Sequence, residues 1–176
     1  MLQLNQTIET QGLEAVARQM CLAARTAPKG RGKDLLETAV VSNPEKHQIA
    51  EQMRVIGRRC DLAFFLRDAD NLDAAGLLVL FGTAKEPLGL PQCGYCGFKN
   101  CADMQQAGGF CSFNVGDLGI AVGSAVSRAA DMRVDNRIMY SVGKAVLELG
   151  LLPSKVRLVY GVPLAARGKN PFFDRS

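Results

Sequence analysis

The sequence predicts an α+β or α/β domain in which helices pack on a sheet. Apolar residues make up 48% of the 176 positions, enough for a substantial core, whereas aromatic residues make up only 6% and Trp is absent. Segments with helical spacing of apolar residues alternate with short apolar runs typical of buried strands. One Gly- and Cys-rich segment, residues 83–112, fits neither pattern. The length suits a single domain, 1–176, with 83–112 as an insert.

The first half of the chain alternates helix and strand. Residues 8–25 carry apolar side chains at helical spacing, and a proline with two glycines ends this helix in a loop over 26–33. Residues 35–41 are short and apolar and predict a strand. A second helix is expected to begin at 42–44, where Pro follows a capping residue, and to run or restart into 62–66.

The second half follows the same layered pattern after the cysteine-containing segment. Residues 74–81 predict a buried strand, residues 114–132 and 137–149 predict helices, and 155–161 alternate as a strand. The polar tail, 167–176, contains a Pro-Phe-Phe run and is expected to wrap onto a partner surface.

Charge and hydropathy exclude some classes of partner. The net charge is +4, from 21 Lys and Arg against 17 Asp and Glu, and the cations are scattered rather than arranged in a stripe with aromatic residues. This argues against a nucleic-acid partner and is still compatible with small anionic ligands. The N-terminus lacks the charged and apolar regions of a signal peptide, and the longest apolar run, 74–81, is too short to cross a bilayer. We therefore expect a cytoplasmic protein with no membrane partner.

Four of the six cysteines form one constellation. They follow the spacing C-x2-C-x4-C-x9-C among several glycines, and they are Cys93, Cys96, Cys101 and Cys111. In a reducing compartment such cysteines indicate metal binding rather than disulfides. Four thiolates without histidine suit a cubane iron–sulfur cluster or tetrahedral zinc. Zinc ribbons usually show two C-x2-C pairs, so the single pair here favours the cluster, with a zinc-stabilised binding module as the alternative.

The remaining candidate side chains have simpler interpretations. Cys21 and Cys60 fall on apolar helical stripes and are expected to be buried thiols that act as small hydrophobic groups. His47 is the only histidine and is expected at the surface near a helix start. One histidine without an evident partner supports no Ser–His–Asp or Cys–His catalytic arrangement.

The cysteine segment resembles a known family. Residues 93–101, followed by Cys111 and by Asp117-Leu-Gly-Ile-Ala-Val-Gly-Ser124, look like the prokaryotic family of uncharacterised ferredoxin-domain-containing proteins, over nearly the whole chain. This resemblance implies a [4Fe–4S] cluster on the four cysteines. The C-x2-C-x4-C run is also similar to the four-iron domain of membrane-associated electron-transfer subunits. That domain has a longer gap before its last ligand, which makes Cys111 the ligand that differs most.

A second resemblance is to flavin-dependent nitroreductases. It is carried in order by Arg25-Thr-Ala-Pro-Lys29, by Asp117–Ala125, by Leu149-Gly-Leu-Leu-Pro153 and by Tyr160-Gly-Val-Pro163. It implies a nitroreductase-like α+β fold, a homodimer, and FMN contacted by Arg25 and Lys29. The sequence departs from that family because Lys29 replaces the usual Ser and because a basic segment ahead of the first helix is missing. Residues 25–29 are equally well interpreted as a plain loop.

These observations lead to a functional expectation. We expect an iron–sulfur protein that transfers single electrons, with a redox partner protein. The first alternative is an FMN-dependent oxidoreductase that also carries the cluster. The helix over 114–132 contains three glycines, which predicts a helix-packing face at a dimer interface, or else a face packed against its own sheet.

Overall fold

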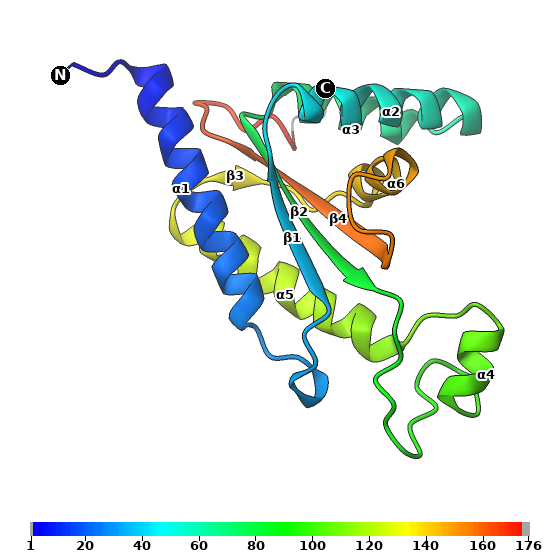
Figure 1. Cartoon of the computed structure of the whole chain (residues 1–176). Coiled ribbons are helices and arrows are strands. Elements are labelled where there is room, and N and C mark those ends of the chain that lie inside the picture. Colours follow the sequence, from blue (N-terminus) through cyan, green and yellow to red (C-terminus); the bar gives the residue numbers. More distant parts are fainter. Residues whose placement is uncertain (1, 174–176) are drawn as a thin grey trace.

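The computed structural model describes residues 2–173 as a four-stranded sheet with helices on both faces (Figure 1). The strands are β1 (Leu36–Val41), β2 (Leu77–Ala84), β3 (Asp135–Asn136) and β4 (Val156–Ala165). The helices are α1 (Asn5–Thr26), α2 (Glu45–Cys60), α3 (Ala63–Ala74), α4 (Cys101–Gln106), α5 (Ser112–Asp131) and α6 (Tyr140–Leu149), with a short 3-10 turn at Gly30–Gly32. The sheet order is β1-β2-β4-β3 and all neighbours are antiparallel. The fold is therefore α+β, and the α/β alternative is wrong.

Strand β2 explains the three layers. Its eight residues are all buried, as expected for a central strand covered on both faces. Because side chains alternate along a strand, Val79 and Phe81 pack with α1 and α5, whereas Leu78 and Leu80 pack with α2, α3 and α6. Figure 1 shows α1 and α5 on one side of the sheet and α2, α3 and α6 on the other.

The elements agree with the sequence-based order but differ at their ends. The second helical segment restarts as predicted, because α2 ends at Asp61 in a left-handed conformation and α3 follows. Helix α3 extends to Ala74, so β2 begins three residues later than predicted. Strand β4 continues to Ala165, and the two-residue β3, which pairs with its end, was not predicted because so short a run has no periodicity.

Helix α5 has two different small-residue faces. Ala121, Ala125 and Ala129 are buried against the sheet and α1. The glycines lie on the other side: a Cβ atom added at Gly119 or Gly123 would meet no atom within 4 Å. Packing inside the same subunit thus holds for the alanines but not for the glycines, whose face is exposed.

The expectation of a buried Cys60 is wrong, whereas the expectation of a partner surface for the tail stays a prediction. Cys60 is exposed, because it lies at the last residue of α2, beyond the end of the core. In the tail, Phe172 is buried in the core formed with α2, α3 and α6, and its carbonyl oxygen accepts a hydrogen bond from Arg137 at 2.9 Å. Phe172 thus packs on its own subunit, whereas Phe173 is 58% exposed, and residues 174–176 lie outside the described residues. Cys21 is partly buried, and this burial raises the pKa of its thiol.

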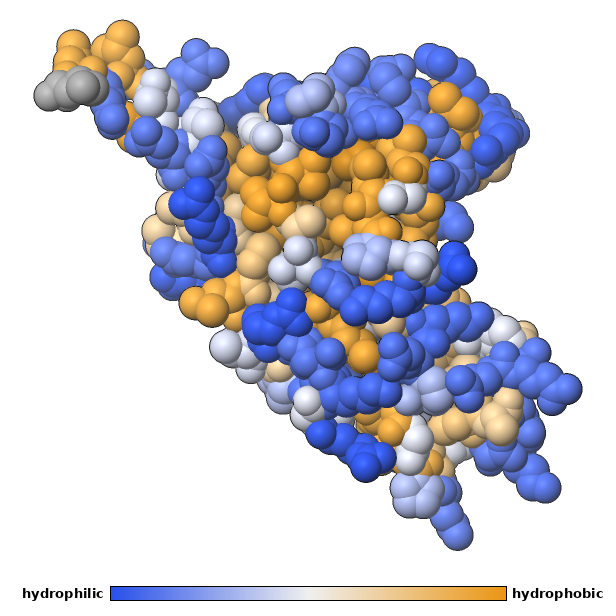
Figure 2. All heavy atoms as spheres, viewed as in Figure 1, coloured by the Kyte–Doolittle hydropathy of each residue, from blue (hydrophilic) through white to orange (hydrophobic). Residues whose placement is uncertain are grey.

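Strand β1 forms one edge of the sheet and leaves apolar side chains uncovered. Figure 2 shows hydrophobic side chains gathered in the middle of this face of the molecule. Val40 is 44% exposed, and beside it lies a groove of about 310 Å³ that is lined mainly by apolar residues of β1 and by Leu151 and Leu152. Among the helices of residues 2–173, none combines the length and hydropathy that a bilayer crossing requires.

Candidate metal centre in the cysteine loop

The cysteine loop, residues 85–111, connects the end of β2 to the start of α5. It projects from one end of the sheet together with α4 (Figure 1). It has a small apolar core of its own, in which Leu88, Met104 and Cys111 are buried and Phe98 and Phe113 pack around them. The loop is therefore a structured unit beside the main core.

Local geometry turns the first two cysteines inward. Gly94 and Gly97 follow Cys93 and Cys96 directly, and both have positive φ angles, 64° and 82°. Residues with side chains rarely adopt this left-handed conformation. The amide of Gly97 donates to the carbonyl oxygen of Gly94 at 2.9 Å and closes a tight turn between the two cysteines.

The other two cysteines lie at helix starts. Cys101 is the first residue of α4, whose N-cap Asn100 accepts a hydrogen bond from the amide of Asp103 at 2.9 Å. Cys111 is the N-cap residue of α5 and is 9% exposed, whereas the other three cysteines of the loop are partly exposed. Two short-range devices, a glycine turn and helix starts, therefore position all four thiols.

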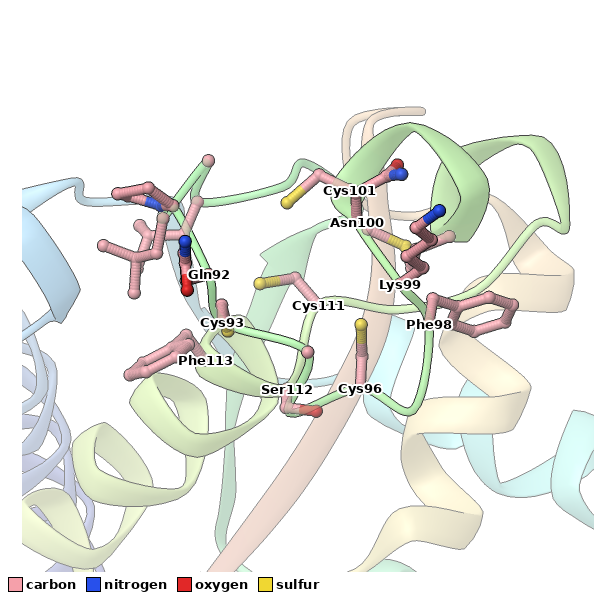
Figure 3. A pocket seen from close by; sticks show the side chains of 16 residues that line it. Gln92, Cys93, Cys96, Phe98, Lys99, Asn100, Cys101, Cys111, Ser112 and Phe113 are labelled. Carbon is pink, nitrogen blue, oxygen red and sulfur yellow. The ribbon is translucent and has the colours of Figure 1, made fainter.

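All four cysteines line a single cavity of about 290 Å³. Figure 3 shows the sulfur atoms of Cys96, Cys101 and Cys111 around one shared space, with Cys93 at its edge; they come from the loop, from the start of α4 and from the start of α5. The volume is roughly ten times the 30 Å³ share of a water molecule in the liquid. Apolar walls from Leu88, Phe98 and Met104 surround this space, and Lys99 also lines it. The cavity thus has room for a group of several atoms.

The spacing of the sulfur atoms bears on the kind of metal group. Tetrahedral zinc has Zn–S bonds of about 2.3 Å, which place the sulfur atoms roughly 3.8 Å apart. In the described part of the chain, no three cysteine sulfurs lie within 4.8 Å of one another. Binding of a single zinc ion would therefore require some of these side chains to move closer together.

Two polar side chains that the sequence did not single out fix the ends of the loop. Asn114, on the first turn of α5, is buried and donates to the carbonyl oxygens of Ala84 at 3.3 Å and of Glu86. Lys85 donates to the carbonyl oxygen of Gly108, and its Nζ lies 5.1 Å from the centre of the Phe110 ring. Their only signal in the sequence is their place at the two ends of the segment.

Arg25 and Lys29, the predicted flavin contacts, have partners within the chain. Lys29 Nζ donates to the carbonyl oxygens of Ala24, Arg25 and Ala27 at 2.7–2.9 Å, which uses all three of its donors at the end of α1. Arg25 Nη1 donates to Asp34 at 2.7 Å and to the carbonyl oxygen of Leu36 at 2.8 Å. In this arrangement Lys29 does not fit as a ligand of a flavin phosphate.

The loop after Lys29 also has an internal anionic partner. The amide of Gly30 donates to Oδ2 of Asp117 on α5 at 3.0 Å. The Gly30 amide is therefore not free to donate to a bound phosphate. This contact joins the residue that follows the nitroreductase-like segment 25–29 to the first residue of the segment 117–125.

A second cluster of possible ligands lies on the opposite side of the sheet. His47, Glu51 and Asp73 are exposed and bring their ligand atoms within 4.8 Å of one another. His47 is at the surface as predicted, with Nδ1 3.2 Å from Asp73 Oδ1. Arg54 donates to both Glu51 and Asp73 at 2.7 Å. The guanidinium of Arg54 already supplies the positive charge that a metal ion would bring to these carboxylates, so we interpret the cluster as an ion-pair network.

Solved structures of nitroreductases resemble this fold. The chain matches the hypothetical oxidoreductase YcnD from Bacillus subtilis with a TM-score of 0.58 and 17% identity, over 89% of this chain and 58% of that protein. It matches nitroreductase CinD from Lactococcus lactis, solved in complex with nicotinic acid, with a TM-score of 0.61 and 14% identity, over 92% and 84% of the two chains. The chain thus spans less than two thirds of the length of YcnD. The nitroreductase-like fold is confirmed.

Sequence comparison points to a family without an assigned activity. A family model described as "Uncharacterized protein containing a ferredoxin domain" matches residues 107–175, a span that includes Cys111. An uncharacterized protein from Archaeoglobus fulgidus is 37% identical over 176 residues, which cover 96% of this chain and 94% of that one. This chain belongs to the same family, that of the uncharacterised proteins containing a ferredoxin domain.

Proposed function

We propose that this protein is a one-electron carrier that holds a [4Fe–4S] cluster on Cys93, Cys96, Cys101 and Cys111. The observation that carries the proposal is the convergence of all four thiols on one cavity of about 290 Å³. Ligation of such a cluster by four Cys thiolates is the ordinary arrangement in ferredoxins. When bound, the cluster would accept and release single electrons.

The residues around the cavity have separate roles in this proposal. The four thiolates supply the ligands, and the positive φ angles of Gly94 and Gly97 allow the backbone to turn tightly beside Cys93 and Cys96. Leu88, Phe98 and Met104 exclude water, which together with backbone hydrogen bonds sets the potential of a cluster. The partial exposure of Cys93, Cys96 and Cys101 leaves a side open to a redox partner protein.

Electron transfer without flavin is the better supported form of this function. The nitroreductase-like fold and the FMN-dependent nitroreductase from Clostridium difficile, a similar structure at 19% identity, favour a flavin enzyme. Against this, Lys29 has no free donor and Gly30 is bound by Asp117. We therefore propose that the cysteine loop, an insertion in a single domain, replaces FMN as the redox centre.

We also propose that the protein forms a homodimer through α5. The outer face of α5 exposes Gly116, Gly119 and Gly123 with open space above each, and Ile120 beside them is 49% exposed. Glycine in a helix interior costs about 1 kcal/mol relative to Ala, so three on one open face are best explained by close approach of another helix. A second copy packed on α5 would supply that helix.

The test is metal and sulfide analysis of protein purified without oxygen. We expect about four iron and four acid-labile sulfide per chain, and an EPR signal of a single reduced cluster after dithionite. One zinc per chain without sulfide would contradict the electron-carrier function and would favour the zinc-stabilised binding module. Stoichiometric flavin released by heating would favour the flavin enzyme.

A further inference from the structure

Residues 85–92, the first part of the cysteine loop, contain no helix or strand, yet side chains from elsewhere bind their carbonyl oxygens. Arg31 Nη1 donates to the carbonyl oxygen of Leu88 at 3.3 Å, and Lys33 Nζ donates to that of Pro87 at 3.4 Å. Lys33 also pairs with the carboxylate of Glu86 at 3.2 Å. Buried or half-buried backbone groups need such partners when no sheet supplies them.

The donors come from one tight turn, residues 29–33, which we call the basic turn. Arg31 has φ 55° and Gly32 has φ 65°, so two successive residues adopt left-handed conformations. This conformation is unfavourable for Arg and persists where surrounding contacts determine it. The Gly30 amide is held by Asp117 at 3.0 Å, which fixes the turn against α5.

The basic turn also touches the wall of the cavity by packing. A Cβ atom added at Gly30 would lie 2.6 Å from Cδ2 of Leu88, so the turn and this side chain are in close contact. Leu88 is 5% exposed, packs with Met104 and Cys111, and lines the cavity. The contacts therefore run without a gap from the basic turn to Leu88 and on to Cys111.

We infer that Arg31 is a positioning residue of the cluster site and acts through Leu88. By holding the carbonyl of Leu88, Arg31 keeps this side chain against Cys111 and fixes the segment that leads to Cys93. The effect of Arg31 on the cluster rests on the proposed function, whereas its effect on the position of the loop does not. In this chain the turn that follows the flavin-loop-like residues 25–29 supports the cysteine loop.

The ordinary alternative is that Arg31 is a solvated surface cation, because exposed hydrogen bonds and ion pairs of long side chains contribute little. The two interpretations differ in what Arg31→Met and Arg31→Lys do. Both variants place an unbranched side chain at the same φ, so backbone strain is matched. Only Lys keeps a charged donor within reach of the Leu88 carbonyl. Arg18→Met, which removes an exposed cation from α1, is the control.

The first measurement is hydrogen–deuterium exchange on the protein as purified, whatever its metal content. We expect the hydrogen-bonded amides of the cysteine loop, such as those of Gly97 and Gly109, to exchange about three- to tenfold faster in Arg31→Met, the effect of losing one typical hydrogen bond. Arg31→Lys should lie near wild type and Arg18→Met should match it. Exchange in Arg31→Met within twofold of wild type would overturn the inference.

The second measurement uses the loaded protein. We expect Arg31→Met to lose its cluster to a chelator about three- to tenfold faster than wild type, and its reduced EPR signal to broaden, with rescue by Lys. Equal loss rates in the Met variant and wild type contradict a role at the cluster. If wild type contains no iron or sulfide, the proposed function fails, and the exchange result still decides whether Arg31 positions the loop.

Discussion

The amide of Gly30 donates a hydrogen bond of 3.0 Å to Oδ2 of Asp117, which lies 87 residues later in the chain. Gly30 follows the nitroreductase-like segment 25–29 and Asp117 begins the segment 117–125, so the contact holds these two parts of the chain together and occupies the Gly30 amide with a carboxylate. The turn that follows the predicted flavin-contacting residues is thus held against α5 by a contact within the chain. The predictions below follow from this arrangement and from the geometry of the cysteine loop.

The ligand assignment predicts a clear division among the six cysteines. Replacement of Cys93, Cys96, Cys101 or Cys111 with Ser should lose or convert the cluster, because each thiol lines the cavity. Visible absorption and EPR of protein reconstituted without oxygen give the readout. Cys21→Ala and Cys60→Ala, outside the loop, are matched controls. A full cluster spectrum in Cys111→Ser would mean that the fourth ligand is another residue.

Flavin affinity should be absent in the wild type. Titration of FMN into micromolar protein, followed by flavin fluorescence, should show no saturable quenching, because Lys29 and Gly30 have internal partners. Asp117→Asn removes the negative charge that faces the Gly30 amide, so this variant tests whether that charge is what excludes FMN. Tight FMN binding by wild type would contradict this prediction and would restore the flavin-dependent oxidoreductase as the leading function.

Lys29 should matter for stability. Its ammonium binds three carbonyl oxygens at the end of α1, so Lys29→Met should lower the free energy of unfolding by about 1.5–3 kcal/mol, the typical value for hydrogen bonds to a charged group. Urea unfolding followed by circular dichroism measures the change. Arg18→Met, which removes only an exposed i,i+4 pair, should change it by about 0.5 kcal/mol or less. Equal effects of the two variants would show that Lys29 is an ordinary surface cation.

Acid should weaken the contact between Arg25 and Asp34. Burial alone would raise the pKa of Asp34, but the hydrogen bonds from Arg25 and the Leu36 amide, with the positive charges of Arg25 and Lys29, together outweigh it, and the net pKa lies below its ordinary value. A carboxyl with a lowered folded pKa stabilises the protein above its unfolded pKa, near 4, and this contribution disappears as the pH falls through the lower folded value. The stability difference between wild type and Asp34→Asn should thus be present at pH 7 and shrink below about pH 4. Glu9→Gln removes a carboxylate without a cationic partner among the described residues and should show no such loss.

The exposed glycine face of α5 predicts how the dimer will respond to substitution. Gly119→Leu and Gly123→Leu meet open space within one subunit, and each should stabilise an isolated helix by up to about 0.8 kcal/mol. If a second copy packs there, both variants should weaken the dimer while the monomer stays folded. Light scattering behind a sizing column gives the mass.

Two outcomes would change this view. A wild-type mass near a single 18.9 kDa chain at micromolar concentration contradicts the dimer. If both glycine variants remain dimeric whereas Val40→Lys does not, the interface lies instead at the edge strand β1, where Val40 is exposed.

The sequence by itself determined the local features of this protein. The order of helices and strands could be predicted, because apolar periodicity reports which face of each element is buried. The candidate ligands could be identified as well, because four cysteines and their glycines fall within 19 residues and their chemistry depends little on the remainder of the fold. Helix ends and the two-residue β3 could not, since they depend on contacts made elsewhere.

Only the tertiary structure decided what the distant residues do. Nothing near Lys29 in the sequence shows that its donors are all used, because the end of α1 supplies the acceptors only when the turn folds back. The partners of Gly30 and Arg31 lie 87 and 57 residues away. Glycines of α5 could be counted in the sequence, but the packed sheet determines that the alanines face inward and the glycines outward. Long-range packing selects one partner for each polar group and one face for each helix, and no local pattern encodes that choice.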